Sequence, residues 1–316
     1  MSEPHVYTEH AVDVLGHAVD LLNAGQRFVL ITSVGIQGGA AREVGSLAVV
    51  CESGIMVGYM SNGCIDRDIR LQARSLLETD EAAKTLRYGE GSPFFDLKLP
   101  CGGSLELLLN ARPDPEAIRT AHKKLTGRNA TLIDHRVPDA TGIARFLYSP
   151  KPRLAIAGRG AVFRATVQIA EAAGFETLTF SPDDADLEAI KHISALNPVF
   201  MSSPLAHQNL PLDSYSGFLT LFHDHDWEPE LLKAALLTDV RFIGCLGSHQ
   251  THQQRLNNLL ADGVDAQSLD RLKGPIGLVP SLRNAPSIAV SAVAQVINEF
   301  PSSIRSLRSE RQEKAA

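Results

Sequence analysis

Two cysteines of this sequence lie in glycine-containing turns, Ser61-Asn62-Gly63-Cys64 and Pro100-Cys101-Gly102-Gly103. Glycine beside a cysteine removes steric cover, so a ligand can approach both the sulfur and the backbone. A buried structural cysteine more often lies inside an apolar run, which is the context of Cys51 and Cys245. The pattern therefore predicts that Cys64 and Cys101 are exposed thiols that bind a soft partner and that their neighbours contact the same ligand: Ser61, Gly63, Gly102 and Gly103.

A second motif, Gly158-Arg159-Gly160, is typical of a turn that joins a strand to a helix and binds a dinucleotide. The third glycine of that fingerprint is replaced by Phe163. The acid that should follow the second strand is also missing, since Ser181 and Pro182 follow Phe180 and Asp183 comes too late. Two interpretations stay open. Arg159 and the helix N-terminus hold a phosphate, or the glycines only make a tight turn.

The segment His223-Asp224-His225-Asp226 follows an apolar run that predicts a strand. Two imidazoles and two carboxylates suit metal ligation or proton transfer, although only alternate residues of a strand share a face. The alternative is a polar loop in which Asp226 caps the next helix. We assign His223, Asp224 and His225 to the lining of a ligand cleft.

Two further groups are candidates for holding an anion. Gly247 and Ser248 follow another predicted strand, where Ser248 would cap a helix whose free N–H groups face the ligand. Arg42 lies between glycine-rich segments and could clamp a phosphate or carboxylate with its two-pronged guanidinium group. A solvated loop charge is the equally open alternative for Arg42.

Periodicity places these residues on the elements of a first domain, residues 1–149. The glycine-rich stretch 38–45 is predicted to be a loop, and Cys64 comes just before a helix, whose dipole favours the thiolate. The predicted helices span residues 11–22, 65–78 and 114–126, and the predicted strands span residues 27–31, 46–50, 54–60, 85–88, 104–110, 131–134 and 144–148.

A linker, Ser149-Pro150-Lys151-Pro152, precedes a second domain, residues 150–316. Alternating strands and helices there predict a Rossmann-like parallel sheet, so the fold class is α/β. The tail from about residue 301 has little apolar content and is expected to be frayed. The predicted strands span residues 153–157, 176–180, 217–222 and 240–243, and the helices span 161–173, 228–237, 251–260 and 287–300.

The composition excludes several classes of protein. A chain of 316 residues that is 44% hydrophobic can form about two domains, and a net charge of -6 argues against nucleic-acid binding. No apolar run is long enough for a membrane span, and the first residues do not have the order of a signal peptide. Four cysteines are too few for a disulfide scaffold, so we expect reduced thiols in the cytoplasm.

Taken together, these segments resemble the xanthine dehydrogenase accessory protein family (XdhC/CoxI). The resemblance covers roughly residues 22–110 and 153–300. Single blocks are weak, but their order and spacing make the set specific: Gly39 to Gly45, Gly54 to Cys64, Cys101-Gly102-Gly103, Gly158-Arg159-Gly160, His223 to Asp226, Ile243 to Ser248 and Pro275-Ile276-Gly277-Leu278. The chain differs from the family pattern at Asn62 and Asp66, which replace Gly and Glu, at Ala41, which replaces Pro, and at Ala161, which often is His.

The resemblance implies a cytoplasmic chaperone that carries the molybdenum cofactor (molybdopterin), supports exchange of its terminal oxo ligand for sulfur, and delivers it. The implied partners are an apo-molybdoenzyme of the xanthine dehydrogenase or aldehyde oxidase type, a cysteine desulfurase and a second copy in a homodimer. On this interpretation the cofactor lies in a cleft between the domains, with Cys64 and Cys101 at its molybdenum end. The alternatives are an NADP-dependent oxidoreductase that binds a nicotinamide nucleotide in the second domain, and a redox-sensing interaction protein.

Overall fold

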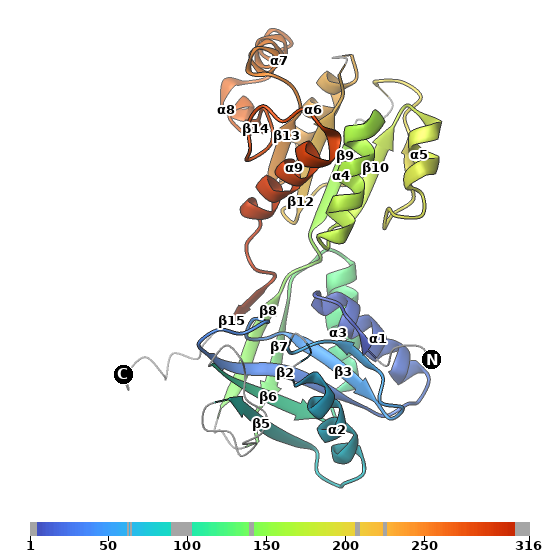
Figure 1. Cartoon of the computed structure of the whole chain (residues 1–316), viewed down its shortest axis with the longest axis vertical. Coiled ribbons are helices and arrows are strands. Elements are labelled where there is room, and N and C mark those ends of the chain that lie inside the picture. Colours follow the sequence, from blue (N-terminus) through green and yellow to red (C-terminus); the bar gives the residue numbers. More distant parts are fainter. Residues whose placement is uncertain are drawn as a thin grey trace. The chain divides into compact units, whose positions relative to one another are not determined.

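The computed structural model of this chain describes residues 5–61, 63, 65–89, 103–138, 142–205, 209–223 and 226–306. The chain divides into two compact units. Unit 1 is Met1–Lys151 together with Ser302–Ala316, and unit 2 is Pro152–Pro301. The fold is mixed α/β, as predicted, with a parallel sheet in unit 2 (Figure 1).

Unit 1 contains a six-stranded sheet in the order β1-β4-β3-β2-β6-β5. Only the pair β1–β4 is parallel, and every other neighbouring pair is antiparallel. A second sheet has the order β15-β8-β7. The strands of the first sheet are β1 (His5–Val6), β2 (Phe28–Gln37), β3 (Leu47–Cys51), β4 (Met56–Gly58), β5 (Ala83–Gly89) and β6 (Ser104–Asn110), and those of the second are β7 (Thr131–Arg136), β8 (Ile143–Tyr148) and β15 (Ile304–Ser306).

Helices of unit 1 cover both faces of the large sheet. Helix α2 (Asp66–Leu77) packs on one face in a cluster that includes Val29 and Ile31. Helices α1 (Ala11–Asn23) and α3 (Pro115–Thr126) pack in another cluster with Phe28 and Leu30. Successive side chains of a strand point to opposite faces, so the unbroken apolar run of β2 is explained by burial on both sides.

Unit 2 is a parallel sheet in the order β11-β10-β9-β12-β13-β14. Numbered within the unit this order is 3-2-1-4-5-6, that of dinucleotide-binding folds, in which ligands bind where the order reverses. That point lies between β9 and β12. The strands are β9 (Arg153–Gly158), β10 (Glu176–Ser181), β11 (Val199–Phe200), β12 (Ser216–Leu221), β13 (Phe242–Cys245) and β14 (Leu272–Lys273), and the helices are α4 (Gly160–Ala172), α5 (Asp184–Ile190), α6 (Glu228–Leu236), α7 (His249–Ala261), α8 (Ala266–Leu269) and α9 (Ala285–Glu299).

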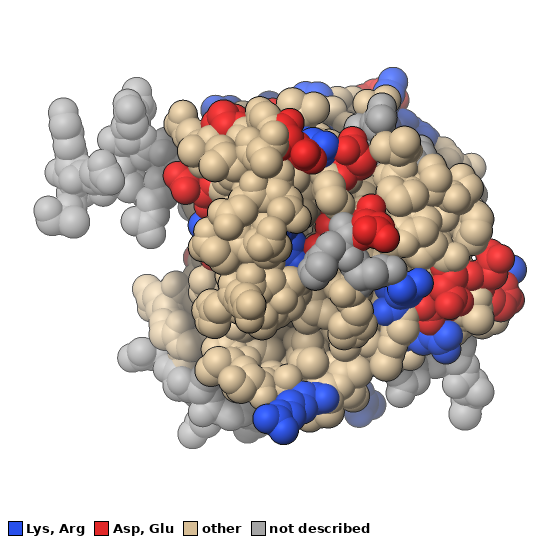
Figure 2. All heavy atoms as spheres, turned by 90° about the horizontal axis from the view of Figure 1, so that it is seen from above, with Lys and Arg blue, Asp and Glu red and all other residues tan. Residues whose placement is uncertain are grey.

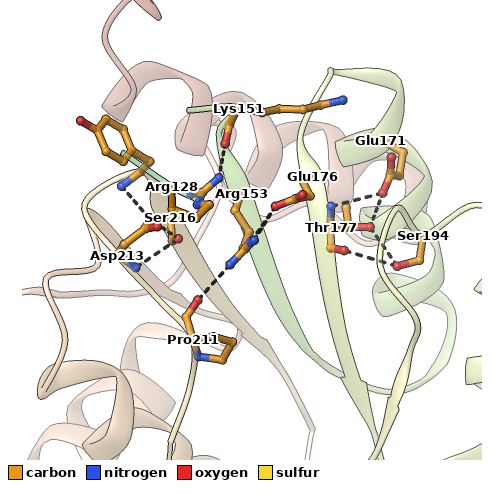
Figure 3. Close-up of polar contacts among 11 residues, drawn as sticks. Arg128, Lys151, Arg153, Glu171, Glu176, Thr177, Ser194, Pro211, Asp213 and Ser216 are labelled. Atoms are coloured by element: carbon orange, nitrogen blue, oxygen red, sulfur yellow. Dashed lines mark hydrogen bonds and ion pairs between the residues drawn. The ribbon is translucent and has the colours of Figure 1, made fainter. Parts of the chain in front are cut away.

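At the amino ends of strands β9 and β10, polar side chains form ion pairs and hydrogen bonds with other parts of the unit (Figure 3). Arg153, at the start of β9, pairs with Glu176 at 2.7 Å and donates to the carbonyl of Pro211 at 3.2 Å. Beside them, Glu171 accepts a hydrogen bond from the N–H of Thr177 at 3.2 Å. In open parallel sheets ligands bind outside the carboxyl ends of the strands, which is the opposite edge of this sheet.

The structure differs from the predicted domain boundary at the C-terminal end of the chain. Strand β15 pairs with β8 of unit 1, with Ile304 opposite Tyr148, and the N–H of Ser149 donates to the carbonyl of Ser303 at 2.8 Å. Residues 302–306 therefore belong to unit 1 and are ordered, not frayed. Strand β15 has only three residues and one apolar side chain, so it shows no periodicity that would predict a strand. Its pairing partner β8 also lies about half the chain away in sequence. Residues 307–316 lie outside the described part of the chain.

Surface charge and helix length agree with the composition. The face in Figure 2 shows small, separate groups of acidic and basic side chains among uncharged residues. Among the described residues, no helix combines the length and the apolar character needed to cross a membrane.

Candidate functional site

The two cysteines at the centre of the prediction, Cys64 and Cys101, lie outside the described residues, as do Gly102, Asp224 and His225. Their flanking residues are described. The site is therefore built from the segments that lead into and out of each cysteine-bearing turn.

The turn around position 64 is held by the buried carboxylate of Asp66, in the first turn of α2. This carboxylate accepts hydrogen bonds from the N–H groups of Met60 (2.9 Å), Ser61 (3.1 Å) and Gly63 (3.0 Å) and from the Ser61 hydroxyl (3.0 Å). The Ser61 hydroxyl accepts in turn from the N–H of Ile65 at 3.1 Å. Gly63 has φ +92°, a conformation that glycine adopts without strain. Ser61 and Gly63 thus shape the turn, and Asp66 fixes it.

Gly103, two residues after Cys101, is required by close backbone packing. A Cβ atom there would lie 2.5 Å from the carbonyl oxygen of Gln37 and 2.7 Å from that of Gly39. Likewise, a Cβ atom at Gly38 would lie 3.1 Å from the Cα of Gly103. Packing against the start of the loop 38–45 therefore accounts for this glycine without a ligand.

Arg42 is not a solvated loop charge, because it is buried and already paired with a carboxylate of the same chain. Its guanidinium group forms an ion pair with the Glu9 carboxylate, donates to the Glu9 carbonyl at 3.0 Å, and lies 4.5 Å from the ring centroid of Tyr59. The Tyr59 hydroxyl also donates to Glu9, and burial raises the pKa of Tyr59. The Arg42 Nε has no hydrogen-bond partner within the described part of the chain.

A cavity of about 320 Å³ adjoins this cluster in unit 1. Its polar lining comes from the segment before α1, from the loop 38–45 and the residue after it, and from the residues before β15: Glu9, His10, Arg42, Glu43, Ser46, Ser302 and Ser303. The Ser302 hydroxyl donates to Glu43, so the returning chain is tied to the loop that carries Arg42.

Strand register brings the loop 38–45 and the segments beside both cysteines to one edge of the large sheet. Gln37 at the end of β2 and Gly89 at the end of β5 both pair with Ser104 at the start of β6. In antiparallel neighbours the end of one strand and the start of the next share an edge. Strand β4 runs parallel to β2, since each is antiparallel to β3, and Tyr59 follows it directly.

Side-chain and backbone contacts join the same segments. Arg42 stacks on Tyr59, next to the turn that contains position 64, while Gly38 packs on Gly103. The Tyr88 hydroxyl, at the end of β5, donates to Asp68 in the first turn of α2 at 2.7 Å. The loop 38–45 is thus flanked on one side by residues leading to Cys64 and on the other by residues following Cys101.

In unit 2, the predicted residues His223, Gly247 and Ser248 line one cavity of about 330 Å³. It lies at the carboxyl ends of β12 and β13 and is completed by Val162, Phe222, Leu246, Thr251 and Ile288. Ser248 caps α7 by accepting from the N–H of Thr251 at 3.1 Å, which confirms the predicted cap. The loop before it is held from within by Arg255, which donates to the carbonyl of Leu246 at 2.8 Å.

Among the described residues, no three His, Cys, Asp or Glu side chains gather as a metal site would require, and two of the four residues of the histidine segment, Asp224 and His225, lie outside them. The alternative prediction, that Asp226 caps the next helix, is wrong. Helix α6 begins after Trp227, and no side chain caps it. The helix starts one residue later than the cap would require.

The turn Gly158-Arg159-Gly160 lies at the predicted strand–helix junction, but the N–H of Gly160 is already bonded within the chain. A Cβ atom at Gly158 would lie 2.8 Å from the Cβ of Leu221, so packing against β12 requires glycine there. Gly160 has φ +79°, and its N–H donates to the carboxylate of Asp186 at 2.5 Å. Arg159 is exposed.

The remaining cysteines, Cys51 and Cys245, are buried, as predicted. Burial raises the pKa of the Cys245 thiol to about 11, so it stays protonated at neutral pH. A reactive role for either thiol has no support from its surroundings.

Two acids that matter for these sites carried no clear sequence signal, Glu9 and Asp186, and each contacts an arginine from another segment. Asp66 stands where the family pattern has Glu, and its partners are the N–H groups of the turn just before it. Asp66 had the best available signal, because it follows a glycine turn and opens a helix.

Residues 21–89 match the model of the XdhC and CoxI family, and residues 154–296 match the XdhC Rossmann domain. The Escherichia coli strain K12 protein described as "Molybdenum cofactor insertion chaperone PaoD" is 30% identical over 297 residues, which is 90% of this chain and 86% of that protein. The uncharacterized protein YqeB of the same strain is 24% identical over 202 residues, 61% of this chain and 35% of its own length.

Among solved structures, that of a xanthine dehydrogenase from Bacillus halodurans matches with a TM-score of 0.74. It covers 92% of this chain and 95% of that chain at 21% identity, a likeness of fold alone. The two matched domains, in the order and at the positions of the two units, and the length of the aligned relative lead to one conclusion. This chain belongs to the XdhC and CoxI family.

Proposed function

We propose that this protein is a chaperone that binds the molybdenum cofactor and inserts it into a molybdoenzyme. The aligned relative over 90% of the chain is described as a molybdenum cofactor insertion chaperone, which supports this class of function. The cofactor is cargo in this proposal, so the protein is a carrier and not a turnover enzyme. We expect it to act in the cytoplasm.

One observation supports the proposed site most directly. The loop 38–45 touches Tyr59 through Arg42 and Gly103 through Gly38, and so contacts segments five residues before Cys64 and two residues after Cys101. Two thiols at one sheet edge would supply soft sulfur ligands, which molybdenum–sulfur chemistry requires. Asp66 would keep the first turn in one conformation during exchange of the cargo.

The anionic part of the cargo has two proposed contacts. In unit 1, the guanidinium group of Arg42 adjoins a cavity of about 320 Å³, and its carboxylate partner Glu9 is exposed. In unit 2, the cavity lined by His223, Gly247 and Ser248 has room for a phosphate or nucleotide group. The finer steps also belong to the proposal: sulfuration of the cofactor with sulfur from a cysteine desulfurase, delivery to an enzyme of the xanthine dehydrogenase or aldehyde oxidase type, and action as a homodimer.

The decisive experiment compares Cys101→Ala and Cys64→Ala with Cys51→Ala. Each protein is purified anaerobically under reducing conditions from cells that make the cofactor, and molybdenum and pterin fluorescence are measured in the denatured eluate. We expect at least about a tenfold loss of bound cofactor in the first two variants, equal to about 1.4 kcal/mol of binding. Cys51 packs in the core of unit 1, so its variant controls for the loss of a thiol as such.

Two outcomes would contradict the proposal. Full cofactor retention and full activation of an apo-molybdoenzyme by both variants would remove the thiols from the site. A wild-type protein that carries no pterin under these conditions, yet folds normally, would remove the chaperone function itself.

A further inference from the structure

The N-terminus of helix α4 in unit 2 is already occupied by a carboxylate of the same chain. Asp186, in the first turn of α5, accepts the hydrogen bond of the Gly160 N–H at 2.5 Å and forms an ion pair with Arg164 of α4. In folds with this strand order, the pyrophosphate of a dinucleotide binds at that helix end, on those N–H groups. The side chain of Asp186 is 2% exposed, so the carboxylate is a fixed part of the unit.

Local structure holds the Asp186 carboxylate in place. Asp183 caps α5 by accepting from the N–H groups of Ala185 at 2.9 Å and Asp186 at 3.0 Å. Leu187 and Ile190 of the same helix are buried. The cap and these apolar side chains anchor the backbone of α5 on both sides of Asp186, and the Gly160 N–H and Arg164 hold the carboxylate itself.

Other parts of the dinucleotide fingerprint are also committed to structure. Phe163 replaces the third glycine and is fully buried in the core beneath α4. The acid nearest to the ribose position, Asp183, is engaged as the helix cap. The Gly160 N–H, Phe163 and Asp183 are thus all engaged in contacts of the unit itself.

We infer that Asp186 is a specificity-determining residue that excludes phosphate groups, and with them NADH and NADPH, from the N-terminus of α4. Its oxygen takes the hydrogen bond that a phosphate oxygen would accept, and its negative charge repels the incoming anion. The unit keeps the strand order of a dinucleotide-binding fold without that fold's usual ligand. This inference does not depend on the proposed function.

The test titrates the full-length protein with NADPH, followed by nicotinamide fluorescence, and with ADP, followed by calorimetry. Wild type, Asp186→Ser and Asp184→Ser are compared. Asp184 is exposed on the same helix, so its variant removes an equal charge without opening the α4 N-terminus. We expect no saturation for wild type or Asp184→Ser up to about 1 mM ligand, and at least about tenfold tighter binding for Asp186→Ser.

Each result decides the inference. Saturable micromolar binding of NADPH by the wild-type protein overturns it, and so does a folded Asp186→Ser variant with no gain. Circular dichroism and thermal melting establish folding. Should Asp186→Ser not fold, Asp186→Asn removes the charge while keeping the size, and a smaller gain over wild type is then the expected outcome. Equal binding by Asp186→Asn and wild type would count against the inference.

Discussion

In each unit an arginine pairs with a carboxylate at a predicted anion site, but the buried member of the pair differs between the units. In unit 1, the buried Arg42 side chain (4% exposed) pairs with an exposed acid, Glu9 (56%). In unit 2, the acid Asp186 is buried (2%) and its partner Arg164 is partly exposed (42%). The fixed member of the pair is thus a cation in unit 1 and an anion in unit 2.

On the proposed function, this difference decides which unit takes an anion from solution. Glu9 is exposed and belongs to the non-helical segment before α1, so we expect it to move aside and leave Arg42 to the anionic cargo. Asp186 lies inside a capped helix and stays where it is. A loop arginine and a helix N-terminus both predict anion binding from sequence, but the exposure of the acid that each one meets determines whether a ligand can compete.

The largest expected effect extends the comparison to the most buried acid–arginine pair that the structure describes. Glu228 and Arg255 are 2% and 4% exposed and lie 2.9 Å apart. Glu228→Ala leaves the Arg255 charge buried without its partner, so we expect the free energy of unfolding of unit 2 to fall by about 3–5 kcal/mol. The only tryptophan of the chain, Trp227, stacks on Phe222 in this unit, and its fluorescence reports the unfolding in urea.

The matched control for that change is Glu230→Ala on the same helix. Glu230 pairs with Lys233 at 2.6 Å, and both side chains are about one-third exposed. Loss of such a pair should cost under about 1 kcal/mol. Equal losses in the two variants would show that exposure does not separate these pairs.

The second largest expected effect concerns the stability of unit 1 near Gly45, at the end of the loop 38–45 that carries Arg42. Tyr148 donates to the carbonyl of Gly45 at 2.7 Å, and buried His135 lies beside it, with Thr32 3.1 Å from its Nδ1. Burial lowers the pKa of His135 from 6.5 to about 4. The unfolded chain therefore binds the His135 imidazole proton more tightly than the folded chain does. The contribution of neutral His135 to the stability of unit 1 is full above pH 6.5 and is lost as the pH falls from 6.5 to 4.

From this shift we expect the free energy of unfolding of unit 1 to be about 2 kcal/mol lower at pH 5.0 than at pH 7.5. Urea unfolding followed by circular dichroism measures it. In His135→Asn this part of the pH dependence should disappear, whereas in His192→Asn, which changes an exposed histidine, it should persist. An unchanged pH profile in His135→Asn would assign the effect to other groups.

The smallest expected effect concerns the exposed acid of the comparison. Glu9→Gln should lower the free energy of unfolding by about 1 kcal/mol. Arg42 is buried, but the Gln amide oxygen still accepts a hydrogen bond, and the Arg42 guanidinium keeps its bond to the carbonyl of residue 9. On the proposed function it should also increase the amount of pterin cofactor retained, because Arg42 is then released more readily. Glu43→Gln, which removes a neighbouring loop charge bonded to Ser302, is the control. A large loss of stability in Glu9→Gln would mean that Glu9 is as fixed as Asp186.

Most of the fold follows from local patterns. The predicted strand 104–110 coincides with β6, and the predicted helix 11–22 differs from α1 (Ala11–Asn23) by one residue. Alternating strands and helices correctly indicated the parallel sheet of unit 2. The elements that were missed are short, such as α5 with seven residues and β15 with three, and too few side chains repeat in them to show a period.

The candidate site was only partly predictable. The Ser248 cap and the glycine turn after β9 depend on residues close in sequence, and both lie where they were expected. The pairing of Arg42 with Glu9 spans 33 residues, and that of Gly160 with Asp186 spans 26. No pattern in either segment indicates the other.

The sequence by itself determined the elements, the α/β class, the turns that need glycine and the residues capable of chemistry, because these depend on near neighbours and on side-chain type. Only the tertiary structure decided that one sheet edge gathers the loop 38–45 with the segments beside both cysteines, and that two carboxylates occupy the predicted anion sites. The physical reason is that burial and pairing are set by strand order and helix packing. These juxtapose residues that are remote in the chain and thereby fix which charges meet a ligand and which meet each other.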